Sequence, residues 1–159
     1  MRTYQRLTAA ALLALATACG TSTPPSTRAT STQAPASTGA PRSENLSEAD
    51  RAAAPQVAQR FVDAANAGDS AAVAATFAED ARFDSVGRIY PSRRDIMDRF
   101  LDPEVIDAGG RYEVTGTRWN GDRYRVDYTF TTRSGAREVF YYEFLVRDGL
   151  IRDVIGRYS

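Results

Sequence analysis

The sequence contains no histidine and no lysine, and it has a single cysteine, Cys19. Without histidine the chain cannot build a Ser-His-Asp or Cys-His catalytic site, nor the usual zinc sites that use histidine. One cysteine cannot form an internal disulfide. Acid–base chemistry would therefore depend on aspartate, glutamate, tyrosine or arginine. No run of acidic residues resembles a calcium loop, so we expect neither a metal nor a cofactor.

Arginine supplies all 20 basic residues, and these balance 20 acidic residues. From Ser47 onward, 16 arginines accompany 19 acidic residues, which leaves this part with a net charge of about −3. No stripe or cluster of arginines stands out in the sequence. Because proteins that bind nucleic acid usually carry a basic patch, the composition argues against a nucleic-acid partner.

Residues 1–18 have the pattern of an export signal. Arg2 and Arg6 precede an apolar run from Leu7 to Ala18. This run is too short to cross a bilayer, because a spanning helix needs about 20 apolar residues. The pattern therefore predicts a signal peptide over 1–18, which takes no part in the fold.

The residues that end this run, LATAC over 15–19, resemble the lipobox of bacterial lipoproteins. In that family the cysteine is acylated with fatty acids such as palmitate and becomes the mature N-terminus. Lipidation would account for the unpaired thiol of Cys19, and would anchor the protein in the cell membrane on its extracytoplasmic face. However, Ala16 replaces the larger apolar residue usual at that position, and Ala16-Thr17-Ala18 also suits an ordinary signal peptidase. Plain secretion stays open as the alternative.

Residues 19–46 are predicted to form a tether. Between Gly20 and Glu44 the chain is nearly all serine, threonine, proline, alanine and glycine, without an aromatic or large aliphatic residue. Such a segment buries too little apolar surface to offset its ordering entropy, so it is expected to be disordered. The folded domain is then expected over 47–159.

Helical patterns dominate the first half of this domain. Apolar residues at helical spacing predict a helix that has Pro55 in its first turn and ends at Gly68. A short helix is expected over 70–77 and a third over 92–101, before a proline. A short strand is expected over 81–84.

Strand patterns dominate the second half. Alternating apolar and polar residues predict strands over 111–119, 124–130, 137–146 and 150–158. The turn Asn120-Gly121 is a strong hairpin signal. Three helices followed by a four-stranded antiparallel meander indicate an α+β domain.

The stretch from Phe61 to Gly87, FVDAANAGDSAAVAATFAEDARFDSVG, resembles the start of a nuclear transport factor 2-like domain. Within that superfamily the stretch resembles the SnoaL-like and ketosteroid isomerase-like branches. The resemblance covers about residues 53–159. It implies a cone-shaped fold in which N-terminal helices pack on a curved antiparallel sheet around an apolar pocket. Such domains often dimerise, so the resemblance also implies a homodimer. The fold hosts enzymes and binding proteins alike.

The resemblance also places candidate site residues. Ketosteroid isomerase uses an aspartate base with a tyrosine and a protonated aspartate as oxyanion donors. The base position falls on Asp84 and the second donor near Tyr142, whereas Phe61, which has no hydroxyl, occupies the place of the tyrosine donor. The resemblance therefore implies Asp84 and Tyr142 as catalytic candidates, and Phe61, Trp119 and Tyr142 as residues of a ligand pocket.

Each candidate also has a structural alternative. As a general base, Asp84 needs a raised pKa inside an apolar cavity that it shares with Tyr142. Otherwise it pairs with an arginine such as Arg82 or Arg88. Tyr142 and Trp119 are then packing residues.

Two further carboxylates, Glu143 and Asp153, lie on neighbouring predicted strands. Both are expected to point outward and to pair with arginines such as Arg125 or Arg152, instead of forming a carboxylate pair inside the cone.

Two functions follow from these observations. The favoured one is a non-enzymatic module of the cell envelope that binds a small apolar ligand or a protein. The alternative is an isomerase or lyase that acts on a hydrophobic carbonyl compound, with Asp84 as general base.

Overall fold

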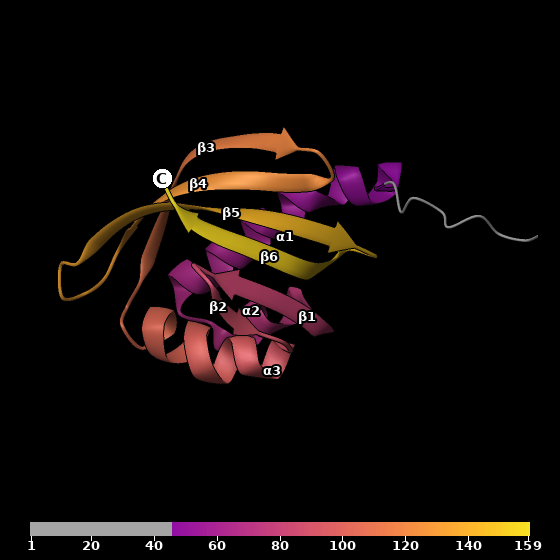
Figure 1. Cartoon of the computed structure of the whole chain (residues 1–159). Coiled ribbons are helices and arrows are strands. Elements are labelled where there is room, and N and C mark those ends of the chain that lie inside the picture. Colours follow the sequence, from indigo (N-terminus) through magenta and orange to yellow (C-terminus); the bar gives the residue numbers. More distant parts are fainter. Residues whose placement is uncertain (1–45) are drawn as a thin grey trace, which may run out of the picture. The chain divides into compact units, whose positions relative to one another are not determined.

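The computed structural model describes residues 46–159 (Figure 1). The predicted signal peptide, Cys19 and the predicted tether up to residue 45 lie outside the described residues. Within the described part, no helix is both long and apolar enough to cross a membrane.

The first helix, α1, runs from Glu48 to Ala67. Ser47 caps it by accepting a hydrogen bond from the backbone N–H of Asp50 at 3.0 Å. Gly68 ends it with a positive φ of 72°, a conformation that glycine adopts without strain. Pro55 lies inside the helix and not in its first turn as predicted, because the cap at Ser47 starts the helix a full turn and more before the proline.

The second helix, α2, is shorter than predicted and covers Ser70–Ala75. The chain then enters strand β1, Phe77–Ser85, which replaces the short strand expected over 81–84. Phe77 belongs to the strand because its ring is fully buried against that of Phe61, at a centroid separation of 5.9 Å. Tertiary packing therefore outweighs the local helical preference of this segment.

The third helical segment extends beyond Pro103, contrary to the prediction. After strand β2, Arg88–Tyr90, a short α3, Arg93–Ile96, continues as a π-helix, η1, over Met97–Ile106. In an α-helix the ring of Pro103 would clash with the carbonyl four residues earlier. Here the segment is π-helical, with hydrogen bonds between residues five apart, and it contains Pro103 without ending there.

The sheet has six strands in the order β2-β1-β6-β5-β4-β3. The last four form the predicted meander: β3 Arg111–Asn120, β4 Arg123–Thr131, β5 Arg137–Arg147 and β6 Leu150–Tyr158. However, β1 pairs with β6 in parallel, so the sheet is mixed and not wholly antiparallel as expected. The reason is that α3 and η1 carry the chain from β2 to the opposite edge, and the meander then returns beside β1 in the same direction.

The predicted α+β class is confirmed, with helices packed on a curved sheet (Figure 1). We call the side of the sheet that carries Phe83, Tyr128, Tyr142 and Phe144 the inner face, and the opposite side the outer face. The four inner-face side chains are buried, and the rings of Tyr142 and Phe144 contact Phe61 of α1.

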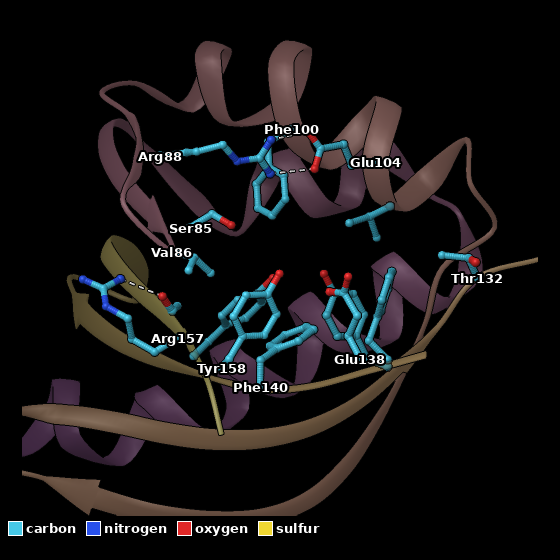
Figure 2. Close-up of a pocket in the computed structure, with 15 residues that line it drawn as sticks. Ser85, Val86, Arg88, Phe100, Glu104, Thr132, Glu138, Phe140, Arg157 and Tyr158 are labelled. Atoms are coloured by element: carbon cyan, nitrogen blue, oxygen red, sulfur yellow. Dashed lines mark hydrogen bonds and ion pairs between the residues drawn. The ribbon is translucent and has the colours of Figure 1, made fainter. Parts of the chain in front are cut away.

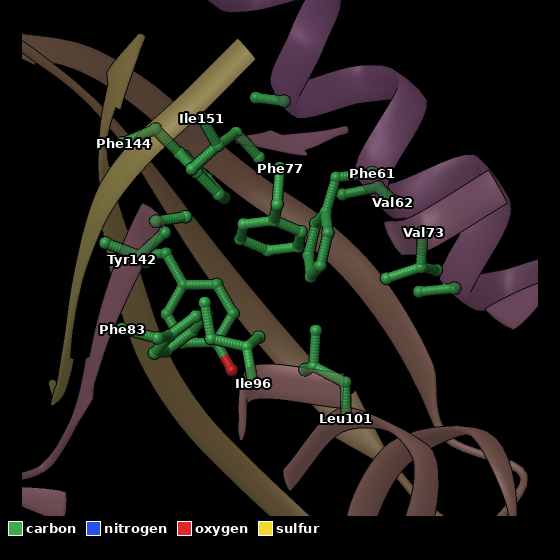
Figure 3. Close-up of a cluster of buried hydrophobic side chains, with 14 of the residues drawn as sticks. Phe61, Val62, Val73, Phe77, Phe83, Ile96, Leu101, Tyr142, Phe144 and Ile151 are labelled. Atoms are coloured by element: carbon green, nitrogen blue, oxygen red, sulfur yellow. The ribbon is translucent and has the colours of Figure 1, made fainter. Parts of the chain in front are cut away.

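Phe61 stands at the centre of the buried core. Its ring packs edge-on against Tyr112 of β3 at 5.7 Å between centroids, and at a tilt against Phe144 of β5 at 5.8 Å. Figure 3 shows Phe61 and Val62 directed from the helix toward the rings of the strands. This one side chain thus links α1 to several strands of the sheet.

Replacing Phe61 with alanine should remove this link. We expect Phe61→Ala to lower the free energy of unfolding by about 3–5 kcal/mol, the usual cost of deleting a buried phenylalanine ring. Urea denaturation followed by circular dichroism measures the loss. The neighbouring Arg60→Ala is the control, because Arg60 is exposed, and its effect should stay within about 0.5 kcal/mol. Equal effects of the two variants would contradict the central role of Phe61.

Candidate functional site

The strand register decides which side chains share a face of the sheet. Paired residues on neighbouring strands point to the same face, and successive residues along a strand point to opposite faces. One cross-strand row consists of Ser85, Gly156, Tyr142 and Val126. The adjacent row consists of Asp84, Ile155, Glu143 and Arg125. Since Tyr142 is on the inner face, the row that contains Asp84 lies on the outer face.

A cavity of about 180 Å³ opens between the inner face, η1 and the β1–β2 hairpin. Six of its fifteen lining residues are aromatic: Phe100, Tyr112, Phe130, Phe140, Tyr142 and Tyr158. Figure 2 shows Phe100 and Glu104 on the helical side, opposite Phe140, Glu138 and Tyr158 on the side of the sheet. The cavity is the described feature that best fits a small-molecule site.

Two buried tyrosines contribute polar groups to the cavity. Tyr112 and Tyr142 are each at least 95% buried, and the hydroxyl of Tyr112 makes no hydrogen bond to any residue of the described part. Burial raises the pKa of both phenols well above the ordinary value of 10. Both therefore keep their protons at neutral pH, and each can donate a hydrogen bond to a ligand or accept one from it.

An ion pair closes one side of the cavity mouth. Arg88 of β2 donates two hydrogen bonds to the carboxylate of Glu104 of η1, at 2.7 and 2.6 Å. The same guanidinium lies 5.5 Å from the ring centroid of Phe100. The hydrogen bond to Glu104 is the main cause that raises the pKa of Arg88 above its ordinary value. The pair joins the β1–β2 hairpin to the π-helix. It also neutralises the guanidinium of Arg88, which therefore has no uncompensated charge with which to bind a ligand.

Gly156 allows Tyr142 to lie against β6. A Cβ atom at Gly156 would approach Cε1 of Tyr142 to 2.9 Å, a separation at which the ring must move. Glycine at this position thus determines where the Tyr142 ring lies, and with it the shape of the cavity floor.

Asp84 does not meet Tyr142 in the cavity, so the predicted base–donor pair is wrong. Its carboxylate lies on the outer face, where the guanidinium of Arg157 donates to it at 2.9 and 3.0 Å and the backbone N–H of Gly87 at 2.8 Å. Arg82 adds a longer contact at 3.4 Å. The hydrogen bond from Arg157 is the main cause that lowers the pKa of Asp84, whereas a general base was expected to have a raised one. The physical reason is that successive residues along a strand point to opposite faces. The row that contains Asp84 therefore lies on the other side of the sheet from the row that contains Tyr142.

Two of the three residues predicted for the ligand pocket do not line the cavity, and we correct their assignment. Phe61 is fully buried in the core below it. Trp119, near the end of β3, packs on Tyr124 at 5.3 Å between centroids and lies under the guanidinium of Arg51 at 4.2 Å. Tyr142 does line the cavity.

Glu143 and Asp153 both lie on the outer face, as expected, but their partners differ from those predicted. Glu143 accepts a hydrogen bond from the side-chain amide of Asn120 at 2.8 Å. Asp153 pairs with Arg82 at 3.0 Å and with Arg123 at 2.7 Å. They contribute to a charged outer surface and form no carboxylate pair in the cavity.

Sequence reasoning missed Tyr112, Glu104 and Glu138 as cavity residues. The alternating pattern of the strands did carry a signal for two of them, because Tyr112 and Glu138 each pair with Phe130, a buried aromatic residue of β4. Glu104 gave no such signal, since its segment was not expected to be helical.

A model of the SnoaL-like domain family matches residues 58–154. The chain belongs to the SnoaL-like family. No curated protein sequence matches the chain. Similar solved structures show the nuclear transport factor 2-like fold, which bears out the resemblance drawn from the sequence.

Three solved structures illustrate this similarity. A predicted polyketide cyclase of Sinorhizobium meliloti has 24% identity and a TM-score of 0.58, over 65% of this chain and 94% of that one. A predicted ketosteroid isomerase of Kribbella flavida has 23% identity and a TM-score of 0.59, over 68% and 78%. A nuclear transport factor 2-like protein of unknown function from Mesorhizobium loti has 19% identity and a TM-score of 0.60, over 68% and 92%. At these identities the likeness shows the fold alone.

The environment of Asp84 predicts an acid-dependent stability. The pKa of Asp84 in the folded state lies below the ordinary 3.8. The carboxylate therefore stabilises the folded state fully at pH values above its unfolded-state pKa, and this stabilisation is lost as the pH falls through its folded-state pKa. We expect Asp84→Asn to cost about 1–2 kcal/mol at neutral pH, a reduced value because Arg157 and Arg82 are partly exposed. Urea denaturation at pH 7 and at about pH 3 should show the difference from the native chain shrinking in acid.

The control for this prediction is Asp107→Asn. Asp107 is exposed, and its carboxylate makes no hydrogen bond or ion pair with the residues that the structure describes. Its replacement should change stability by less than about 0.5 kcal/mol at either pH. A pH-independent cost of Asp84→Asn would show that the ion pair is not its cause.

Proposed function

We propose that this SnoaL-like domain is a non-enzymatic module that binds a small, largely apolar molecule outside the cytoplasm. The observation that carries the proposal is the aromatic cavity with two protonated tyrosines at its floor. A cavity of about 180 Å³ is only slightly larger than the ~150 Å³ that accommodates benzene in a protein core, and smaller than the usual ~300–1,000 Å³ of sites for larger ligands. The ligand should therefore be about the size of one or two rings.

The arrangement of charges supports binding over catalysis. Proton abstraction from a carbonyl compound needs a carboxylate or an imidazole beside the oxyanion donors. The chain has no histidine, Asp84 lies on the outer face, and Glu104 is held by Arg88. Glu138 lines the cavity but is exposed to solvent, so it is not enclosed with the tyrosine hydroxyls in a water-excluded site. The names of the similar structures include a cyclase and an isomerase, but this chain does not have the base that the resemblance assigned to it.

A cellular location is part of the same proposal. The basic start, the short apolar run and Cys19 support export followed by lipidation, which would hold the domain on the extracytoplasmic face of the cell membrane through acyl chains. A protein partner of the envelope and a homodimer, which the family resemblance implies, stay predictions.

The cavity predicts a small molecule that co-purifies with the protein. Mass spectrometry of an organic extract of the purified full chain should detect it. Gly156→Ala should abolish its retention, because the added Cβ displaces the Tyr142 ring into the cavity, at a cost of about 1–3 kcal/mol in stability. Ser85→Leu, which fills the cavity from β1, should have the same effect without moving that ring.

The control for both variants is Gly116→Ala on β3. Its Cβ would meet only the carboxylate of Asp127, at an ordinary 3.5 Å, so retention should be unchanged. Circular dichroism establishes that each variant is folded. Retention of the same molecule by folded Gly156→Ala and Ser85→Leu would place its site outside the cavity.

Lipidation of Cys19 can be tested directly. Cells that express the chain are grown with an alkyne analogue of palmitate, and the protein is then isolated and coupled to a fluorophore. The native chain should carry the label and partition into detergent, whereas Cys19→Ser should carry none, because the thiol is the acceptor of the acyl chain. An unlabelled native chain in the culture medium would favour plain secretion.

A further inference from the structure

The chemistry of the cavity also indicates which class of molecule it binds, an inference that rests on the proposed binding function. Three of the four charged residues that line the cavity are neutralised within the protein. Arg88 is paired with Glu104, and Arg157 is paired with Asp84 on the outer face. The fourth, Glu138, is a solvent-exposed residue of the cavity lining and has no hydrogen bond or ion pair with any residue between 46 and 159. The cavity therefore carries one uncompensated negative charge.

The position of Glu138 follows from the strand register. It pairs across β4 and β5 with Phe130, a buried cavity residue, and lies two positions before Phe140, which also lines the cavity. Its side chain is therefore on the inner face. In Figure 2, Glu138 lies on the side of the sheet, across the cavity from Phe100 and Glu104. Next to burial, its charge is among the causes that raise the pKa of Tyr112 and Tyr142, so it acts on both hydroxyls.

The hydroxyl of Tyr112 is a second polar group of the cavity, next to that of Tyr142. Tyr112 is only 5% exposed, and its oxygen makes no hydrogen bond within the described part of the chain. A buried hydroxyl without a partner costs free energy. A ligand in the cavity could supply that partner by donating an N–H to the phenol oxygen, which keeps two lone pairs for accepting.

The aromatic wall suits a positive charge. Aromatic faces attract cations, and cages of aromatic side chains hold alkylammonium groups. At the mouth of this cavity, Phe100 and Tyr90 already have the guanidinium of Arg88 over them, at 5.5 and 5.9 Å from the ring centroids. Phe130 and Phe140 are further rings of the lining, and both are neighbours of Glu138 in the sheet.

We propose that the cavity binds a small organic cation, a primary amine or alkylammonium compound with about one ring. Its nitrogen lies between the carboxylate of Glu138 and the aromatic wall, and an N–H donates to the oxygen of Tyr112. Its apolar part occupies the space above Tyr142. Anionic molecules are disfavoured by the carboxylate of Glu138, since Arg88 and Glu104 neutralise each other.

Isothermal titration calorimetry on the purified full chain tests this proposal with three probes of the same size. Benzylammonium, benzyl alcohol and benzoate differ mainly in charge. We expect benzylammonium to bind at least about tenfold more tightly than benzyl alcohol, with benzoate the weakest, because a charge-assisted hydrogen bond and the ring faces favour the cation. Glu138→Gln should weaken benzylammonium about tenfold and leave benzyl alcohol unchanged.

Glu113→Gln is the matched control, because Glu113 is an exposed carboxylate on β3 that does not line the cavity. It should leave the binding of all three probes unchanged. If benzyl alcohol or benzoate binds as tightly as benzylammonium, or if Glu138→Gln has no effect, the cation proposal is wrong while the binding function stands. If none of the three probes binds, both the cation proposal and the proposed cavity function are wrong.

Discussion

The packing of Phe61 against the curved sheet is the contact on which the rest of the domain depends. The ring belongs to α1 and contacts residues of β1, β3 and β5, so it joins the helix to strands that are far apart in the sequence. Because the sheet curves around this contact, its inner face forms a closed core at one end and a small cavity at the other. The core therefore defines the floor and the width of the site.

Strand alternation gives each charged residue its role. Asp84 and Tyr142 lie in neighbouring rows, and a shift of one residue places them on opposite faces. On the outer face, Asp84 becomes an acceptor for Arg157 and a contributor to stability. On the inner face, Glu138 is left without an arginine, although the chain has many. The sheet thus carries a network of ion pairs on its outer face and an unpaired carboxylate on its inner face.

Membership of the SnoaL-like family identifies the fold, whereas a few side chains of the cavity determine its chemistry. In this chain the family's architecture is kept, with a mixed curved sheet and helices on its inner face. The position assigned to a tyrosine donor is occupied by Phe61, which serves the core. The polar groups of the cavity instead come from Tyr112, Tyr142 and Glu138, which together suit recognition of a small ligand.

Much of the architecture could be predicted from local patterns. The stop at Gly68 and the alternation of the last four strands each depend on residues close together in the chain, so the end of α1, the meander and the α+β class followed from the sequence. The length of β1 and the continuation of the third helix past Pro103 could not be predicted, because burial of Phe77 and the π turn depend on distant contacts.

The sequence by itself determined the composition of the site: no histidine, a surplus of aromatic residues in the strands and no lysine. Only the tertiary structure decided which of these side chains meet. The direct reason is that the cavity forms between strands and a helix whose residues lie far apart in the chain. Arg88 and Glu104, for example, line the same cavity as Tyr142. Local patterns predict which face of a strand a residue occupies, whereas the register between strands determines which residues lie next to it.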